Sequence, residues 1–150
     1  MVNKTYSLKE LKKKKMLLKK DGLCIGLANG CFDLLHMGHL KLLDESKQTC
    51  DFLIIALNSD KSVKLLKGDS RPIDNQNIRI KKLLNTDFVD AIILFDENTP
   101  LKIIQELLPD ILIKGSDYEK KAIVGADTVI KNGGSIKIIK LLSGYSTTKI

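Results

Sequence analysis

A chain of 150 residues that is 43% hydrophobic, with a mean hydropathy of −0.03, has room for one domain with a real core and little room for two. The longest apolar run, 52–57, is far shorter than the roughly 18 to 20 residues that cross a bilayer, and three cysteines without a C-x-x-C pair argue against a disulfide framework and a zinc cage. The net charge of +7 lies wholly in the first 20 residues, where eight lysines face one acid.

The first predicted element is a Lys-rich helix. Ser7 and Glu10 form a capping box, and Asp21-Gly22 ends the helix after about Lys20. Its lysines suit a solvated helix face, a nucleic-acid arm or a basic patch beside a polyanionic substrate. Because aromatics and arginines do not interleave with them, we expect no nucleic-acid partner. No apolar signal-peptide core follows, so we expect a cytoplasmic protein that does not contact membranes.

The rest of the chain alternates between apolar runs and helical patterns. Short apolar runs predict strands at 23–28, 52–57, 88–95, 111–114 and 136–141. Helical patterns predict helices at 38–49, 76–85, 101–108 and 121–131, whereas 61–74 reads as loop. This alternation is typical of repeated βαβ units. We expect one α/β domain over 1–150, doubly wound and Rossmann-like, with a mainly parallel five-stranded sheet, helices on both faces and the 1–22 helix packed on it.

Ligands of such sheets bind beyond the carboxyl ends of the strands, which directs attention to the segment after the first strand. His36 and His39, the only two histidines, stand three residues apart at a predicted helix start. The N–H groups and dipole of that turn favour an anion, and imidazoles that donate to phosphoryl oxygens would complete a clamp. The alternatives are a pair of histidines that only cap the helix, and a metal site, for which Asp33 is available as a third ligand.

Other strand ends carry groups suited to phosphates and ribose. The only arginines, Arg71 and Arg79, follow the second strand near Lys67, and a forked guanidinium suits phosphate recognition. Either arginine could equally be a surface residue. Residues 114–118 after the fourth strand offer a carboxylate, and 144–148 after the last offer hydroxyl and backbone donors, although hydroxyl residues also cap helices.

No catalytic nucleophile is evident, and neither a Walker A loop nor G-x-G-x-x-G is present. Cys31 reads as a small turn residue. A phosphate clamp without a nucleophile suits direct transfer to an ionised phosphate acceptor, which needs no general base.

The motif N-G-C-F-D-L-L-H-M-G-H-L at 29–40 and the distal G-Y-S-T-T-K-I at 144–150 resemble the HxGH nucleotidyltransferase superfamily. Within it the chain is similar to the heptose 1-phosphate adenylyltransferase (ADP-heptose synthase) family. The further matching stretches are S-L-K-E-L at 7–11, A-L-N-S-D-K-S-V-K at 56–64, L-K-G-D-S-R-P-I at 66–73, F-D-E-N-T-P at 95–100, P-D-I-L-I-K-G-S-D-Y at 109–118 and V-G-A-D at 124–127.

The resemblance implies transfer of AMP from ATP to D-glycero-β-D-manno-heptose 1-phosphate, with Mg²⁺ bound mainly through the ATP phosphates and no metal site of the protein's own. It implies catalytic roles for His36, His39, Lys67 and Arg79. Nucleotide binding is expected from Asn29, Gly30, Cys31, Phe32, Asp33, Gly38, Arg71, Lys114, Gly115, Asp117, Gly144, Tyr145, Ser146, Thr147 and Thr148.

The chain departs from related patterns at three places. Leu141 stands where cytidylyltransferases have Arg, which favours ATP over CTP; Ser116 replaces a usual Gly and 142–143 a usual Val-Glu. Members of the family are often fused to a sugar kinase, which we expect here to be a separate chain, and are often dimers, so a homodimer stays open. The alternatives are the same chemistry with CTP or another acceptor, as in a polyol phosphate cytidylyltransferase or an FAD synthase-like enzyme, and a binding module without turnover.

Overall fold

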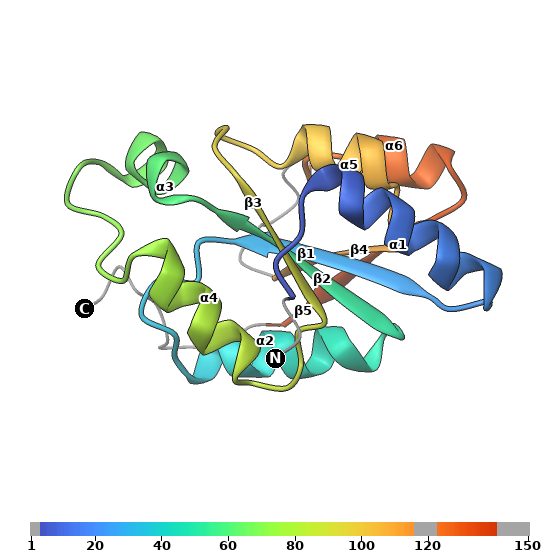
Figure 1. Cartoon of the computed structure of the whole chain (residues 1–150), viewed down its shortest axis with the longest axis horizontal. Coiled ribbons are helices and arrows are strands. Elements are labelled where there is room, and N and C mark those ends of the chain that lie inside the picture. The colour runs from blue at the N-terminus through green and yellow to red at the C-terminus, as the bar shows by residue number, and fades with distance from the viewer. Residues whose placement is uncertain (1–3, 116–122, 141–150) are drawn as a thin grey trace.

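The computed structural model describes residues 4–115 and 123–140, which form a five-stranded sheet with helices on both faces (Figure 1). The strands are β1 (Ile25–Gly30), β2 (Phe52–Asn58), β3 (Ala91–Phe95), β4 (Ile111–Gly115) and β5 (Ser135–Ile139). The helices are α1 (Leu8–Lys20), α2 (Met37–Gln48), α3 (Asp60–Lys67), α4 (Gln76–Leu84), α5 (Leu101–Leu107) and α6 (Ala126–Lys131). All neighbouring strands are parallel, so the predicted Rossmann-like α/β fold is confirmed.

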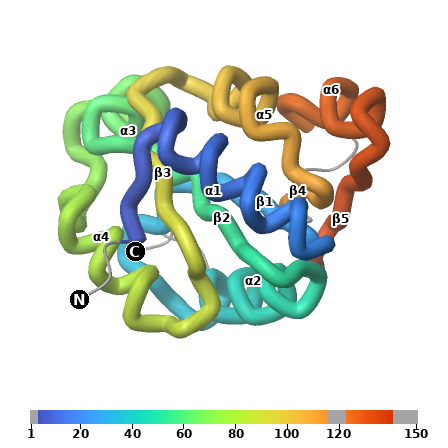
Figure 2. The backbone as a smooth tube through the Cα atoms, turned by 45° about the vertical axis from the view of Figure 1, so that its right-hand side comes forward, coloured from blue at the N-terminus to red at the C-terminus, as the bar shows by residue number. Residues whose placement is uncertain are grey.

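Two apolar cores lie on opposite faces of the sheet because successive strand residues point to opposite sides. On one face α1, α5 and α6 cover the sheet, and on the other α2 and α4 do (Figures 1 and 2). The first core includes Leu11 of α1, Ile104 of α5 and Val129 of α6. The second includes Leu43 of α2 and Leu83 of α4. Each strand of the sheet centre is therefore buried on both faces, which explains its continuous apolar sequence.

The strand order is β3-β2-β1-β4-β5, so the direction in which strands are added reverses between β1 and β4. Parallel pairing puts Ala28 beside Ile113, and Asn29 and Lys114 follow them, each one residue before the end of its strand. Ligands of doubly wound sheets bind at such a reversal of strand order. The loop after β1 leads to His36, the N-cap of α2, and to His39 in the first turn of that helix.

The Lys-rich helix α1 is held to the domain by its buried side and by ion pairs. The capping box of Ser7 and Glu10 is present, as predicted. Leu11 is 1% exposed, and Lys12 and Lys19 pair with Glu106 and Asp110 on the α5 side. The lysine run therefore contributes partly to docking of α1. No helix within residues 4–115 and 123–140 is long and apolar enough to cross a membrane.

The prediction that 61–74 is loop was wrong for its first half, which forms α3. Ser59 caps this helix by accepting from Ser62 N at 3.2 Å, and Val63 is buried beneath it. The loop runs only from Gly68 to Asn75. The lysines of α3, together with Gly68 and Pro72 after it, made the whole stretch read as polar loop.

Other boundaries also differ from the prediction, and β1 covers Ile25–Gly30 rather than 23–28. β3 begins at Ala91 rather than at 88, and Asp87, with a left-handed backbone (φ 66°), lies in the turn before it. α6 begins at Ala126 rather than at 121, after Gly125 with φ 83°. β5 covers Ser135–Ile139, and the predicted last residue, 141, lies outside the described residues.

Leu11→Ala is expected to lower the free energy of unfolding by about 2 to 4 kcal/mol, because it opens a cavity between α1 and the sheet. Leu17→Ala on the same helix is the matched control, since Leu17 is 55% exposed and should cost less than about 0.5 kcal/mol. Urea unfolding of the two variants measures the difference. Equal effects would contradict docking of α1 through Leu11.

Candidate active site

The two histidines cap helix α2 reciprocally. His36 is the N-cap residue, and its Nδ1 accepts hydrogen bonds from Gly38 N at 3.1 Å and from His39 N at 3.4 Å. In return, His36 N donates to Nδ1 of His39 at 3.2 Å. The rings stack with centroids 3.8 Å apart and 17° between their planes. The pair thus reproduces the geometry of a Ser-x-x-Glu capping box with two imidazoles.

This geometry fixes the tautomer of both rings. Each Nδ1 accepts a hydrogen bond from a backbone N–H, so the proton of each neutral ring is assigned to Nε2. Burial lowers the pKa of His39 to about 4, with further lowering by the His36 ring and the Lys67 ammonium, and burial also lowers the pKa of His36. Both rings are therefore neutral at pH 7 and carry an Nε2–H donor.

The expected role of the first helical turn needs correction. Two of its backbone N–H groups, those of Gly38 and His39, already donate to His36. Gly38 is buried at this point. An anion at this helix start would be recognised mainly by the imidazole Nε2–H groups and the helix dipole.

The loop between β1 and α2 packs its apolar residues beneath the histidines. The Phe32 ring is buried, with its centroid 5.3 Å from that of His39, and a Cβ on Gly30 would come within 3.0 Å of this ring. Gly30 therefore makes room for Phe32. Burial raises the pKa of the Cys31 thiol, which stays protonated, as suits a turn residue rather than a nucleophile.

Asp33 faces the loop between α3 and α4 and is 2% exposed. Its carboxylate accepts from Ile73 N and Asp74 N at 2.8 Å each, and from Arg71 Nη1 at 3.3 Å. Burial alone would raise the pKa of Asp33, but these hydrogen bonds and the arginine charge lower it below its usual value. The carboxylate is thus ionised and satisfied by protein groups.

Arg79 is completely buried, although the sequence suggested a phosphate ligand. Nη1 donates to Cys31 O at 2.8 Å and to Asn58 O at 2.7 Å, Nη2 to Asp60 Oδ1 at 2.8 Å, and Nε to Asp74 O at 3.0 Å. Four of its five donors therefore meet protein acceptors. Asp60 and Asp74 were not recognised as site residues from sequence, although Asn58-Ser59-Asp60 is a polar group directly after a buried strand.

The other predicted cations lie around the same strand ends. Lys67 is exposed at the last residue of α3, and its charge acts on His39 and Cys31. Lys114 Nζ donates to Asn29 Oδ1 at 2.6 Å, joining the ends of β4 and β1 beside Gly115. The predicted residues of the loop after β1 thus contact the loop between α3 and α4 through Asp33 and Arg71, and the end of β4 through Asn29 and Lys114. Asp117 and Gly144, Tyr145, Ser146, Thr147 and Thr148 lie outside the described residues.

The described residues do not build a metal site of their own. No group of three or more His, Cys, Asp or Glu side chains within residues 4–115 and 123–140 is arranged to hold a metal ion. Asp33, the carboxylate considered as a third ligand beside the histidines, is committed to Ile73, Asp74 and Arg71. These residues do not fit a protein-held cation.

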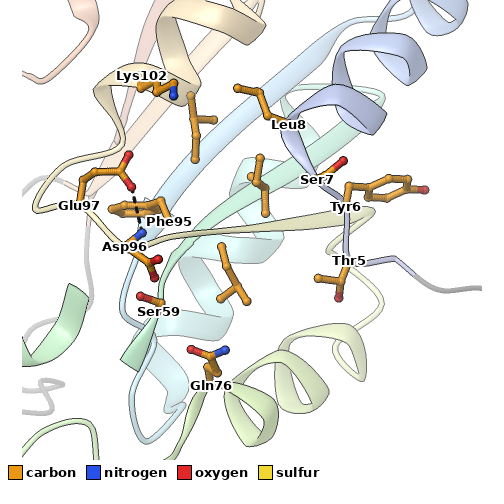
Figure 3. Close-up of a pocket in the computed structure, with 13 residues that line it drawn as sticks. Thr5, Tyr6, Ser7, Leu8, Ser59, Gln76, Phe95, Asp96, Glu97 and Lys102 are labelled. Carbon is orange, nitrogen blue, oxygen red and sulfur yellow. Dashed lines mark hydrogen bonds between the residues drawn. The ribbon is translucent and has the colours of Figure 1, made fainter. Parts of the chain in front are cut away.

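A cavity of about 420 Å³ lies elsewhere, along the outer edge of β3 (Figure 3). Tyr6, Ser59, Gln76, Phe95 and Lys102 are among its lining residues, and neither histidine is. The N-terminal segment borders it and pairs with the strand, since Tyr6 N donates to Ile92 O at 2.8 Å. This cavity is therefore separate from the histidine pair, whose chemistry is the better candidate for a phosphate site.

A family model described as cytidylyltransferase-like matches residues 27–150. Over 130 residues the chain is 49% identical to the bifunctional protein HldE of Mesorhizobium japonicum, and over 129 residues 50% identical to that of Hyphomonas neptunium. These matches cover 87% and 86% of this chain but only 26% of each relative.

Two solved structures resemble the fold. The lipopolysaccharide core biosynthesis protein from Thermoplasma volcanium is 32% identical, with a TM-score of 0.65 over 83% of this chain and 100% of that chain. Pantoate-beta-alanine ligase from Francisella tularensis has a TM-score of 0.66 over 98% of this chain and 75% of that chain. At 18% identity, the second shows a shared fold alone.

We expect His39 to titrate near pH 4 and to remain an Nε2–H tautomer above it. As the pH falls from about 6.5 to about 4, the unfolded chain takes up this proton before the folded chain does, so the stability contributed by neutral His39 is lost in that window. Nitrogen-15 NMR of the imidazoles measures the midpoint and the tautomer. A midpoint at or above 6, or a proton on Nδ1, would contradict the reciprocal cap.

Proposed function

We propose, from the premise that the chain belongs to the cytidylyltransferase-like family and is a nucleotidyltransferase, that it transfers AMP from ATP to D-glycero-β-D-manno-heptose 1-phosphate. The products are ADP-heptose and pyrophosphate. Support for the pathway comes from the relatives: one is a lipopolysaccharide core biosynthesis protein, and the HldE proteins are bifunctional, with this chain matching about a quarter of each.

The observation that carries the proposal is the stacked pair of neutral histidines at the reversal of strand order. The two rings are stacked with their centroids 3.8 Å apart. Two Nε2–H donors on rings this close suit adjacent oxygens of a polyphosphate. Their orientation is set by the backbone before any ligand arrives, which is the arrangement that stabilises developing charge at low reorganisation cost.

The proposed reaction is a direct in-line displacement. A phosphate oxygen of the sugar 1-phosphate attacks the α-phosphorus of ATP, and the bond from that phosphorus to the oxygen bridging to the β-phosphate breaks. Pyrophosphate leaves with that electron pair. The attacking phosphate is already ionised, so no general base is needed, and His36 and His39 donate to oxygens on which negative charge accumulates.

The other predicted residues take supporting roles in this proposal. Lys67, exposed beside His39, offers a mobile cation to the phosphates, and Lys114 with Asn29 lies on the nucleotide side of the site. Asp117 is proposed for the ribose, and 144–148 for the distal phosphates. Mg²⁺ would enter on the triphosphate oxygens and neutralise part of their charge, as suits a cation bound mostly through substrate phosphates.

The first test is pyrophosphate release with ATP or CTP, against the heptose 1-phosphate and glycerol 3-phosphate in all four combinations. Release with ATP and the heptose phosphate alone is expected. Release only with CTP, or only with glycerol 3-phosphate, would keep the chemistry and reject the proposed substrates. Binding of nucleotide with no product in any combination would favour a binding module.

His39→Ala is expected to reduce turnover by about 10²-fold or more, because it removes a preorganised donor. His39→Gln should retain more activity than His39→Ala, since its amide N–H can replace part of a neutral donor. Gln48→Ala, at the exposed end of α2, is the control for changes in this helix. Near-normal turnover of folded His39→Ala would refute the role.

A further inference from the structure

Two buried charges of opposite sign lie beneath the site, and they do not pair with each other. Asp33 is 2% exposed and Arg79 is 0% exposed. Each instead bridges the same two segments, the histidine loop (31–36) and the α3–α4 loop (68–75). Buried charges are costly unless hydrogen-bonded, so these bonds restrain both segments.

The bridges run in both directions between the two loops. Asp33 belongs to the histidine loop and accepts from the backbone N–H groups of Ile73 and Asp74 at 2.8 Å each. Arg79 belongs to α4, just after the other loop, and donates to Cys31 O at 2.8 Å and to Asp74 O at 3.0 Å. Asp74 is therefore fixed by both charges, through its N–H and its carbonyl.

Arg79 also anchors this arrangement to the sheet and to α3. Nη1 donates to Asn58 O, the last residue of β2, at 2.7 Å, and Nη2 donates to Asp60 Oδ1 at the start of α3 at 2.8 Å. The segment that carries Lys67 and Arg71 is thus held at its beginning and its end by one guanidinium.

We propose that Asp33 and Arg79 are positioning residues, which lock the α3–α4 loop against the histidine loop so that Lys67 and Arg71 face the phosphates bound at His36 and His39. The inference rests on the proposed function for what is bound there. Neither charge contacts substrate in this arrangement: both Asp33 oxygens accept backbone N–H groups, and four Arg79 donors meet protein acceptors.

Amide hydrogen exchange on the ligand-free chain tests the lock without any substrate. Asp33→Asn keeps the size of the side chain but turns one acceptor into a donor that faces a backbone N–H. Exchange at Ile73 and Asp74 should rise about 10-fold or more, as loss of a hydrogen bond to a charged group predicts. Exchange of the β2 amides at Ile54 and Ile55 should not change.

Two further variants make the exchange measurement specific. Asp87→Asn is the matched control, because Asp87 is exposed with a left-handed backbone that Asn tolerates, and it should leave 73–74 unchanged. Arg79→Lys keeps the charge with fewer donors, and it should speed exchange at the same loop amides. Unchanged exchange at 73–74 in both Asp33→Asn and Arg79→Lys would overturn the lock.

A double-mutant cycle separates positioning from contact with substrate. With the substrates identified by the pyrophosphate assay, Asp33→Asn should lower kcat about 10-fold when Lys67 is present, and less than about 3-fold in a Lys67→Ala background. Equal losses in both backgrounds would show that Asp33 acts on the substrate directly. Hydrogen exchange is measured without substrate, so its result does not depend on the proposed acceptor. The exchange test can support the lock even when the pyrophosphate assay rejects the heptose phosphate, and the assay can succeed when the exchange test fails.

Discussion

The guanidinium of Arg79 is the interaction on which the geometry of the site depends. A fully buried cation is stable only when its donors meet acceptors, and here these come from the ends of β1 and β2, from α3 and from the α3–α4 loop. Moving any of these segments would leave a charge unsatisfied. The polar edge of the sheet is therefore as constrained as its apolar core.

At the centre of the proposed site lie two neutral donors, His36 and His39, rather than cations. Burial of His39 keeps its imidazole uncharged, and the backbone bonds to both Nδ1 atoms orient the pair. A neutral N–H attracts a phosphoryl oxygen less strongly than an ammonium does in the ground state. Such a donor leaves more of its stabilisation for the charge that accumulates during transfer. The cations, Lys67 and Arg71, lie on the adjoining segment.

The sequence was sufficient for the fold. Continuous apolar runs predicted five parallel strands, and the helix start that carries the two histidines lies, as predicted, after the first of them, since both depend on local pattern. The burial of single charged side chains, and their hydrogen-bond partners far along the chain, could not be predicted from local sequence pattern. Arg79 looks like a phosphate ligand by residue type, yet it meets Cys31, 48 positions earlier. Asp33 meets residues 40 and 41 positions later. α3 was missed because its lysines and the Gly68 and Pro72 that follow it made the whole stretch read as polar loop.

The reciprocal cap of α2 means that the same two side chains stabilise the helix, through Nδ1, and act in the proposed reaction, through Nε2. An N-cap is worth about 0.5 to 2 kcal/mol, so a chain that exchanges either histidine also weakens the start of a core helix. If the proposed reaction holds, substitution at either position lowers both turnover and the abundance of folded protein. A descendant that no longer acted on its substrate would still need both histidines to cap α2. In such a chain the histidine pair would reflect the stability of the helix and not the reaction.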